Sequence, residues 1–410
     1  MSTLLPVPPP GALRTLSAAT LANTVGTGLW VTGSALYLTR VVGISPSTVG
    51  VGLTVAGLVG LAASVPLGGL ADRRDPRTLR AALQVLQAGV AGAYLLVDSV
   101  AVFLVVAVLD ALLVSGNLAV RAALIAAVAG PDGRVHAFAT LRAVANVGIA
   151  VGTALAGLAL AADTREGYDL LVVGNAATYL LSAALLMRLP AGPPRPVTGP
   201  RRPGRPLRDL PFLAVSGASA VLSLHWVVLT LVLPLWVVGR TGAPPVTVSA
   251  VLLVNTVLTV LLAVRLGRGV NQAGPAATRM RHAGLVLAAT TPLYAATAGL
   301  PLPLAVGLLL TTTVGYTIGD LWHGTAGAGL AYDLAAPDAV GAYQGVDGLL
   351  SGLARAIGPA LLTVVVLGGG TAGWLGLGVL FAVTGLAVPA LTRRALADRR
   401  APATPGPAPP

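Results

Sequence analysis

The chain contains no lysine, no cysteine and a single glutamate, Glu166, among its 410 residues. The absence of lysine excludes a P-loop ATPase and Schiff-base chemistry, and no cofactor is predicted. The absence of cysteine excludes disulfides, zinc thiolates and thiol nucleophiles. Charged residues make up only 10% of the chain, whereas a soluble domain carries roughly 25%. This composition argues against a soluble enzyme.

Apolar residues, in contrast, make up 55% of the chain, and the mean hydropathy is +0.84. The chain is therefore too apolar to be disordered. A helix needs about 20 apolar residues to cross the hydrocarbon core of a bilayer. Twelve such runs are present, and none shows the alternation that is typical of a membrane β-barrel. They are residues 13–39, 48–71, 79–97, 100–124, 137–162, 168–189, 212–238, 246–266, 282–299, 302–331, 341–367 and 373–391.

The runs predict an all-α integral membrane protein with two six-helix bundles, at residues 13–189 and 212–394. Residues 190–211, rich in proline and arginine, are interpreted as a cytoplasmic linker between the bundles. Residues 1–12 and 395–410 are predicted to be disordered, the second as a cytoplasmic tail.

Arginine placement predicts the orientation in the cell membrane. With both termini in the cytoplasm, the outside loops hold only Arg40, Arg165 and Arg240, and the inside segments hold most of the other arginines. The net charge of +12 is therefore explained by topology, and no nucleic-acid partner is predicted.

After the second run the chain reads Gly68-Gly69-Leu70-Ala71-Asp72-Arg73-Arg74-Asp75-Pro76-Arg77. This segment resembles the loop 2–3 signature of the major facilitator superfamily, G-x-L-a-D-R-x-G-R-[RK]. Asp75 stands where the family usually has glycine, and Pro76 where it usually has a basic residue. The matching residues, which the resemblance implies to form a gate, are Gly68, Leu70, Ala71, Asp72, Arg73 and Arg77. The alternative is that the arginines only enforce topology.

A second comparison with the family concerns the fifth run. Drug–proton antiporters of this superfamily usually carry G-x-x-x-G-P there, and this chain has Gly148, Gly152 and then Thr153 in place of proline. The two glycines still permit close helix packing. The missing proline weakens the resemblance to antiporters but not the fold prediction.

The resemblance implies that the first, fourth, seventh and tenth runs line a central cavity. Polar residues at helical spacing mark a face of each run, although serine and threonine often bond only to their own helix. The candidates for contact with substrate are Asn23, Thr27, Trp30, Asn117, Trp226, Tyr316, Thr317 and Arg355.

Asp110 and Asp320 lie near the middle of predicted cavity helices and are the candidates for proton coupling. His323, one turn beyond Asp320, could share a proton with it. His225 could be a packed neutral imidazole. Arg355 needs a counter-charge, for which Asp320 and Asp110 are candidates, because Asp347 is two turns away on the same helix.

These observations predict a secondary transporter that acts as a monomer by alternating access, with proton-coupled efflux of an apolar or amphipathic small molecule. One alternative is an integral-membrane enzyme, but no paired aspartate or histidine motif of prenyl or acyl transferases is present. Another is a non-transporting sensor on the same fold.

Overall fold

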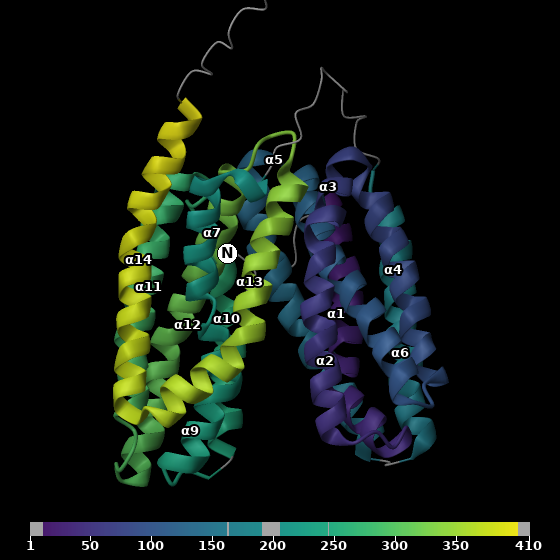
Figure 1. The fold of residues 1–410 in the computed structure, drawn as a ribbon, viewed down its shortest axis with the longest axis horizontal. Helices are drawn as coiled ribbons and strands as arrows, with labels where there is room; N and C mark the ends of the chain where they lie inside the picture. The colour runs from purple at the N-terminus through teal and green to yellow at the C-terminus, as the bar shows by residue number, and fades with distance from the viewer. Residues whose placement is uncertain (1–10, 162–163, 191–205, 245, 401–410) are drawn as a thin grey trace, which may run out of the picture.

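The computed structural model describes residues 11–161, 164–190, 206–244 and 246–400. These residues form helices and connecting turns, and no strand occurs among them (Figure 1). In chain order the elements are α1 (Ala12–Leu36), η1 (Tyr37–Val41), α2 (Pro46–Gly60), η2 (Leu61–Ala63), α3 (Ser64–Arg73), α4 (Pro76–Ala93), η3 (Tyr94–Leu96), α5 (Val100–Ala161), α6 (Arg165–Met187), η4 (Pro206–Arg208), α7 (Leu210–Leu222), α8 (His225–Val227), η5 (Val228–Val232), α9 (Leu233–Arg240), α10 (Val246–Leu266), α11 (Ala273–Ala295), α12 (Leu302–Asp333), α13 (Val340–Leu362), η6 (Thr363–Gly368) and α14 (Gly370–Arg400).

Short polar side chains set the starts of several helices. Ser45, Asp75, Thr164 and Asp209 each accept a hydrogen bond from a backbone N–H in the first turn of the helix that follows. In α2, α4 and α7 a proline occupies the first or second helical position, where its missing N–H costs nothing. Caps of this kind satisfy N–H groups that have no partner within the helix.

Each of the twelve predicted runs corresponds to a helical segment. Two of them, residues 100–124 and 137–162, share the label α5, which is interrupted at Gly130, where φ is 64° and ψ is 178°. Within the described residues, nine helices are long and apolar enough to cross a membrane, with α5 counted once. The helices α1 and α11 are not among the nine, because threonine, glycine and polar residues lower their hydropathy.

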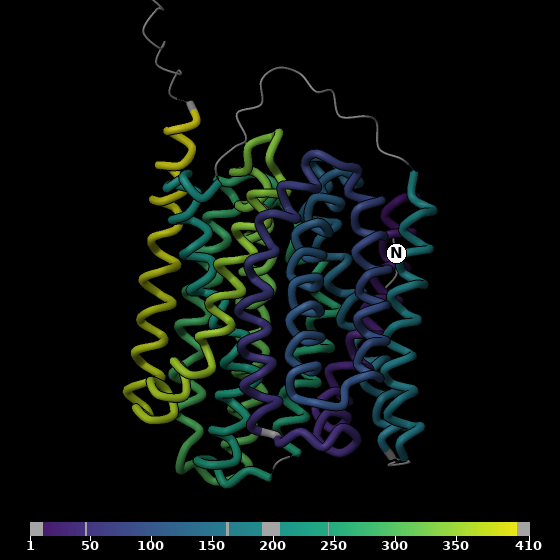
Figure 2. Tube along the Cα trace, turned by 45° about the vertical axis from the view of Figure 1, so that its right-hand side comes forward, coloured from purple at the N-terminus to yellow at the C-terminus, as the bar shows by residue number. Residues whose placement is uncertain are grey.

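The helices before and after residue 200 gather on opposite sides of the molecule (Figures 1 and 2). The two sides touch through α3 and α13 and through contacts of α5 with α10, α12 and α13. Large apolar side chains such as Leu158 and Val364 are exposed, at 74% and 73%. Exposure of this kind is expected where lipid, not water, covers the surface.

Two differences from the predicted boundaries are found at the ends of segments. Residues 395–400 were predicted to be disordered but are helical, because α14 continues to Arg400. Arg399 holds this extension by bonds to Asp209, at 2.9 Å, and to the carbonyl of Leu334. Residues 206–211 of the predicted linker form η4 and the start of α7. The rest of the linker and of the terminal predictions lies outside the described residues.

Glycines let backbones meet within each side of the molecule. A Cβ on Gly152 of α5 would lie 2.0 Å from the carbonyl oxygen of Val25 in α1, and one on Gly148 would lie 2.1 Å from Thr24 Oγ1. On the other side, a Cβ on Gly284 of α11 would lie 2.7 Å from the Cα of Gly385 in α14. The predicted close packing at Gly148 and Gly152 is confirmed.

We expect Gly152→Leu to abolish or severely reduce folded protein. The added side chain would push against backbone, and overpacking typically costs about 1–3 kcal/mol even where only side chains must move. Gly157→Leu, on the same helix, is the matched control, because a Cβ there meets nothing within 4 Å. Size-exclusion profiles of fluorescent fusions measure both variants. Equal monodisperse yields for the two would contradict the close α1–α5 contact.

Candidate functional site

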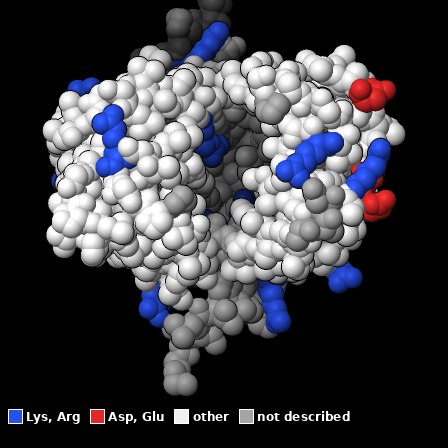
Figure 3. Space-filling view, turned by 90° about the horizontal axis from the view of Figure 1, so that it is seen from below, with Lys and Arg blue, Asp and Glu red and all other residues white. Residues whose placement is uncertain are grey.

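A hollow opens at the end of the molecule where α9 lies in Figure 1. Figure 3 views this end and shows the hollow between two lobes, with arginine side chains inside it and few acidic groups in view. The hollow thus separates the two sets of helices at this end. At the opposite end α3 and α13 are in contact.

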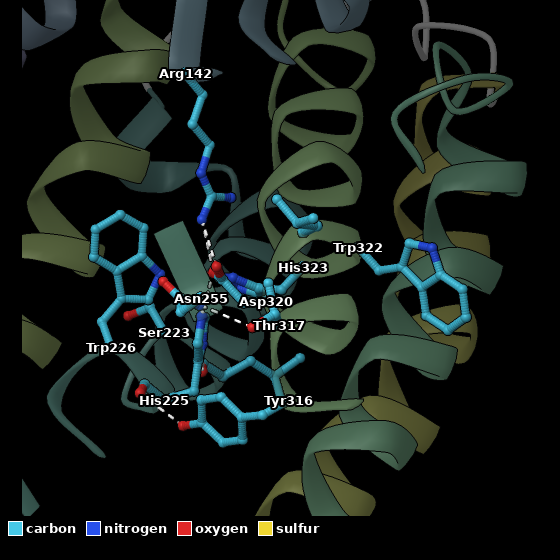
Figure 4. Close-up of polar contacts among 12 residues, drawn as sticks. Arg142, Ser223, His225, Trp226, Asn255, Tyr316, Thr317, Asp320, Trp322 and His323 are labelled. Carbon is cyan, nitrogen blue, oxygen red and sulfur yellow. Dashed lines mark hydrogen bonds and ion pairs between the residues drawn. The ribbon is translucent and has the colours of Figure 1, made fainter. Parts of the chain in front are cut away.

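A buried ionic cluster, made of Arg142, Asp320 and His225, joins the two sides of the molecule (Figure 4). Arg142 of α5 donates from Nη2 to both carboxylate oxygens of Asp320 of α12, at 2.8 and 2.7 Å. His225 of α8 lies on the same carboxylate, with its Nε2 2.7 Å from Oδ1. The side chains of Arg142, Asp320 and His225 are 13%, 8% and 2% exposed. At this burial, charge-assisted bonds are strong, and loss of one partner is costly.

Both ring nitrogens of His225 lie within hydrogen-bond distance of an oxygen. Nδ1 is 2.7 Å from the carbonyl oxygen of Leu222, which only accepts, and Nε2 is 2.7 Å from Asp320 Oδ1. The imidazole and the carboxylate, both titratable groups, are therefore in direct contact inside the cluster.

Three predicted cavity residues surround this cluster. The guanidinium carbon of Arg142 lies 5.3 Å from the ring centroid of Trp226, which is 42% exposed. Tyr316 donates from its hydroxyl to the carbonyl of His225, at 2.7 Å, and Thr317 accepts from the Asn255 amide at 3.0 Å. The structure thus brings Trp226, Tyr316 and Thr317 together with Asp320.

The histidine that contacts Asp320 is His225, not His323. The Nε2 of His323 lies 3.0 Å from the carbonyl oxygen of Ser219 and 3.3 Å from its Oγ. Although Asp320 and His323 are one turn apart on α12, the imidazole turns toward α7 while the carboxylate faces α8 and α5. His323 remains near the cluster, with its ring centroid 4.9 Å from that of His225.

Asp320 is also not the counter-charge of Arg355, because its carboxylate forms an ion pair with Arg142. Among the described residues no ion pair to Arg355 within 4 Å is found, and the acid that acts on it electrostatically is Asp347 of the same helix. Asp110 likewise forms no hydrogen bond or ion pair with the described residues. Sequence spacing identified these buried charges but not their partners.

The other predicted cavity residues lie in α1 and the first half of α5. Thr27 donates to the carbonyl of Asn23 in its own helix, at 3.2 Å. Trp30 packs against Tyr94, with ring centroids 4.4 Å apart. Asn117 is 8% exposed and bonds to residues of α4. None of these contacts reaches the cluster at Asp320.

Asp72, from the predicted gating motif, binds the start of α13. Its carboxylate accepts from the backbone N–H groups of Gly341 and Ala342, at 2.6 and 2.8 Å, and the residue is 8% exposed. An acidic side chain at a helix N-terminus is stabilised by unpaired N–H groups and by the helix dipole. Gly68 makes this approach possible, since a Cβ there would lie 2.2 Å from the carbonyl oxygen of Gly341.

The remaining motif residues stabilise the loop itself. Asp75, at the family's glycine position, caps α4 by accepting from Arg77 N at 3.0 Å. Partial burial opposes ionisation, but this bond, the Thr78 hydroxyl and the charge of Arg77 lower the pKa of Asp75 overall. Arg77 also donates to the carbonyl of Leu189, at 2.7 Å. Ala71 is buried, and Arg73 is exposed.

Sequence reasoning underrated two members of the cluster, His225 and Arg142. The available signal was that each is ionisable and lies inside an apolar run, where such groups face a partner or a cavity. Within the described residues no group of three or more His, Asp or Glu side chains is placed to hold a metal ion.

The comparisons with known proteins agree on the family. The family model described as Major Facilitator Superfamily matches residues 16–359. No curated protein matches the sequence. Solved structures of the same fold include the human organic anion transporter MFSD10 (TETRAN), with 16% identity, a TM-score of 0.69, and coverage of 92% of this chain and 98% of that chain.

Two further structures resemble the chain at similar identity. One is a bacterial homologue of the iron transporter ferroportin in an outward-facing state, with 15% identity, a TM-score of 0.73, and coverage of 94% and 99%. The other is the proton:xylose symporter XylE bound to 6-bromo-6-deoxy-D-glucose, with 14% identity, a TM-score of 0.65, and coverage of 92% and 95%. At these identities the likeness shows the fold. Because the family match spans most of its 410 residues, the chain belongs to the Major Facilitator Superfamily and is a multi-pass secondary transporter, not an enzyme.

Proposed function

We propose that the chain exports an apolar or amphipathic small molecule across the cell membrane in exchange for protons. The observation that carries this proposal is the Arg142–Asp320–His225 cluster. Its arginine comes from one set of helices, and its acid and histidine come from the other. A proton at this point therefore changes a bond between the parts that must separate and rejoin during alternating access.

The conformation of the molecule, which is open at one end and closed at the other, supports this proposal. With both termini cytoplasmic, as the arginine distribution predicts, the hollow in Figure 3 faces the outside. The opposite end, which would then be cytoplasmic, is closed by the hydrogen bonds between Asp72 and the start of α13. The cluster then lies between an open outer end and a closed inner end, which is the arrangement needed for proton uptake from outside.

The chemistry of one cycle follows from the direct contact of Asp320 with Arg142 and His225. A proton on Asp320 removes the negative charge that holds Arg142, so the bond between the two sets of helices weakens. When the cluster faces the cytoplasm and a proton leaves, the carboxylate is restored and binds Arg142 again. A substrate at Trp226, whose ring lies against Arg142, competes with these changes, which couples its movement to that of the proton.

The proposed substrate class rests on the side chains around the cluster. Trp226 is 42% exposed and offers an aromatic face beside the ring of His225, whereas Tyr316 is fully buried on another side of that ring. Surfaces of this kind bind apolar and aromatic groups. The proton:xylose symporter XylE, which has the same fold, illustrates that this fold supports proton coupling.

Transport by the purified chain tests the proposal. Proteoliposomes with an imposed pH gradient are expected to accumulate one or more members of a panel of amphipathic fluorescent compounds. A protonophore is expected to abolish the accumulation, because the gradient is the only energy source. Accumulation that persists with the protonophore contradicts proton coupling. Binding without movement of any compound favours the sensor alternative.

A further inference from the structure

A second buried charge cluster lies between α4 and α5, away from Asp320. Arg80 is 2% exposed, and its Nε donates to Asn117 Oδ1 at 3.2 Å. Its Nη1 is buried without a hydrogen-bond partner, as is Nε of Arg121. The charged group that interacts electrostatically with Arg80 is Arg121, and the group that interacts with Arg121 is Tyr332; neither is an acid of the aspartate or glutamate type. Among the described residues, no carboxylate lies within 4 Å of either guanidinium.

Amide groups complete the surroundings of these arginines. Gln84 is fully buried, and both its amide oxygen and its amide nitrogen lack a partner. By contrast, Gln87 accepts from Asn117 at 2.5 Å and donates to Tyr179 at 3.5 Å. Arg80, Gln84 and Gln87 recur at helical spacing on α4, so they present one polar face to α5.

Arg80 is a buried charge without an acid, and its neighbour Arg121 is a partly buried one with an unpartnered Nε. This arrangement is costly, because arginine stays protonated and burial removes its water. A fully buried amide with no partner adds a further cost. A bound anion with several acceptor oxygens would remove both costs, since guanidinium groups bind carboxylate and phosphate oxygens well. Packing alone offers no such compensation.

We propose that Arg80, Arg121 and Gln84 form a binding site for an oxyanion, meaning a carboxylate or phosphate group. Arg80 is in the first turns of α4, directly after the loop of Asp72 and Asp75, so the site lies toward the closed end of the molecule. Tyr332 of α12, whose hydroxyl donates to the carbonyl of Ala122, lies close enough to interact electrostatically with Arg121 from the other set of helices. Separation of α12 from α5 gives the anion access. The site does not depend on the proposed proton coupling.

Thermal unfolding of the full chain in phosphate-free detergent tests this site. Inorganic phosphate or sulfate, compared with chloride at equal ionic strength, is expected to raise Tm by roughly 3 °C or more near saturation. The single variants Arg80→Gln and Arg121→Gln are expected to lose this response. Each is also expected to match or exceed the Tm of the wild type without anion, because an unpaired buried charge is gone.

The control is Arg165→Gln, whose side chain is 75% exposed at the start of α6, and which should keep the full response. Mixed micelles distinguish a lipid source. A shift produced by phosphatidylglycerol, but not by phosphatidylcholine or free phosphate, and lost in Arg121→Gln, identifies a headgroup as the oxyanion. No shift with phosphate, sulfate or phosphatidylglycerol overturns the proposal. So does an equal shift in the wild type and in both arginine variants.

Discussion

Replacement of Asp320 by asparagine is expected to reduce accumulation driven by a pH gradient strongly and to leave counterflow exchange measurable. Asparagine keeps the size of the side chain but neither takes up a proton nor carries the charge that holds Arg142 and His225. Hydrogen bonds to charged groups contribute about 1.5–3 kcal/mol each, so we expect coupled transport to fall by roughly 10- to 100-fold. Accumulation and counterflow in the same proteoliposome preparation measure the two activities.

Three variants make this result specific. Asp320→Glu keeps the proton and should restore part of the coupled transport. The double variant Asp320→Asn with Arg142→Gln removes both charges of the pair, and it guards against loss of folding from an unpaired buried arginine. Asp110→Asn tests the other acid proposed for coupling. Wild-type accumulation in Asp320→Asn would exclude this residue as the coupling site.

The second large effect is expected at Asp72. Asp72→Asn should leave the protein folded and inserted but slow transport, because the closed end loses the charge that holds the start of α13. A charge at a helix N-terminus is worth up to roughly 2 kcal/mol when partly buried, which corresponds to a change of about 30-fold between two states. The open-inward state should gain population by a factor of that order.

Labelling measures this shift directly, because the chain has no native cysteine. Ala335→Cys places a thiol at a residue that is 9% exposed, close after the end of α12. We expect faster modification by a membrane-impermeant maleimide in the Asp72→Asn background. Asp75→Asn is the matched control, since Asp75 caps its own helix and does not touch α13. Unchanged labelling and unchanged transport would show that Asp72 is not a gate.

The helices, and Asp72 as a residue with a special contact, were predictable from the sequence because their signals are local. Apolar runs of about 20 residues must become helices in lipid, whatever surrounds them. Asp72 was recognised for the same reason, since its neighbours in the chain identify it. The extension of α14 beyond residue 394, by contrast, was missed because its cause is not local. Arg399 bonds to Asp209 and to Leu334, which are distant in the sequence.

The partners within the site were not predictable, because spacing along one helix does not say which side chain a neighbouring helix presents. His323 is the sequence neighbour of Asp320, yet the ring that binds the carboxylate belongs to His225, 95 residues away. Arg142 lies 178 residues from Asp320. The buried amide of Gln84 gave no signal, since its lack of a partner is a property of the packed structure.

The glycine contacts described above have a mechanical consequence. Where the backbones of α1 and α5 meet at Gly152, and those of α11 and α14 at Gly284, no flexible side chain lies between them to absorb strain. Each set of helices is therefore stiff along these seams. A local displacement, such as the release of Arg142 from Asp320, is then expected to move the part of α5 after Gly130 together with α1, because Arg142 and Gly152 both lie in that part. Most of the adjustment during transport is therefore expected at the boundary between the two sets of helices rather than at these two seams.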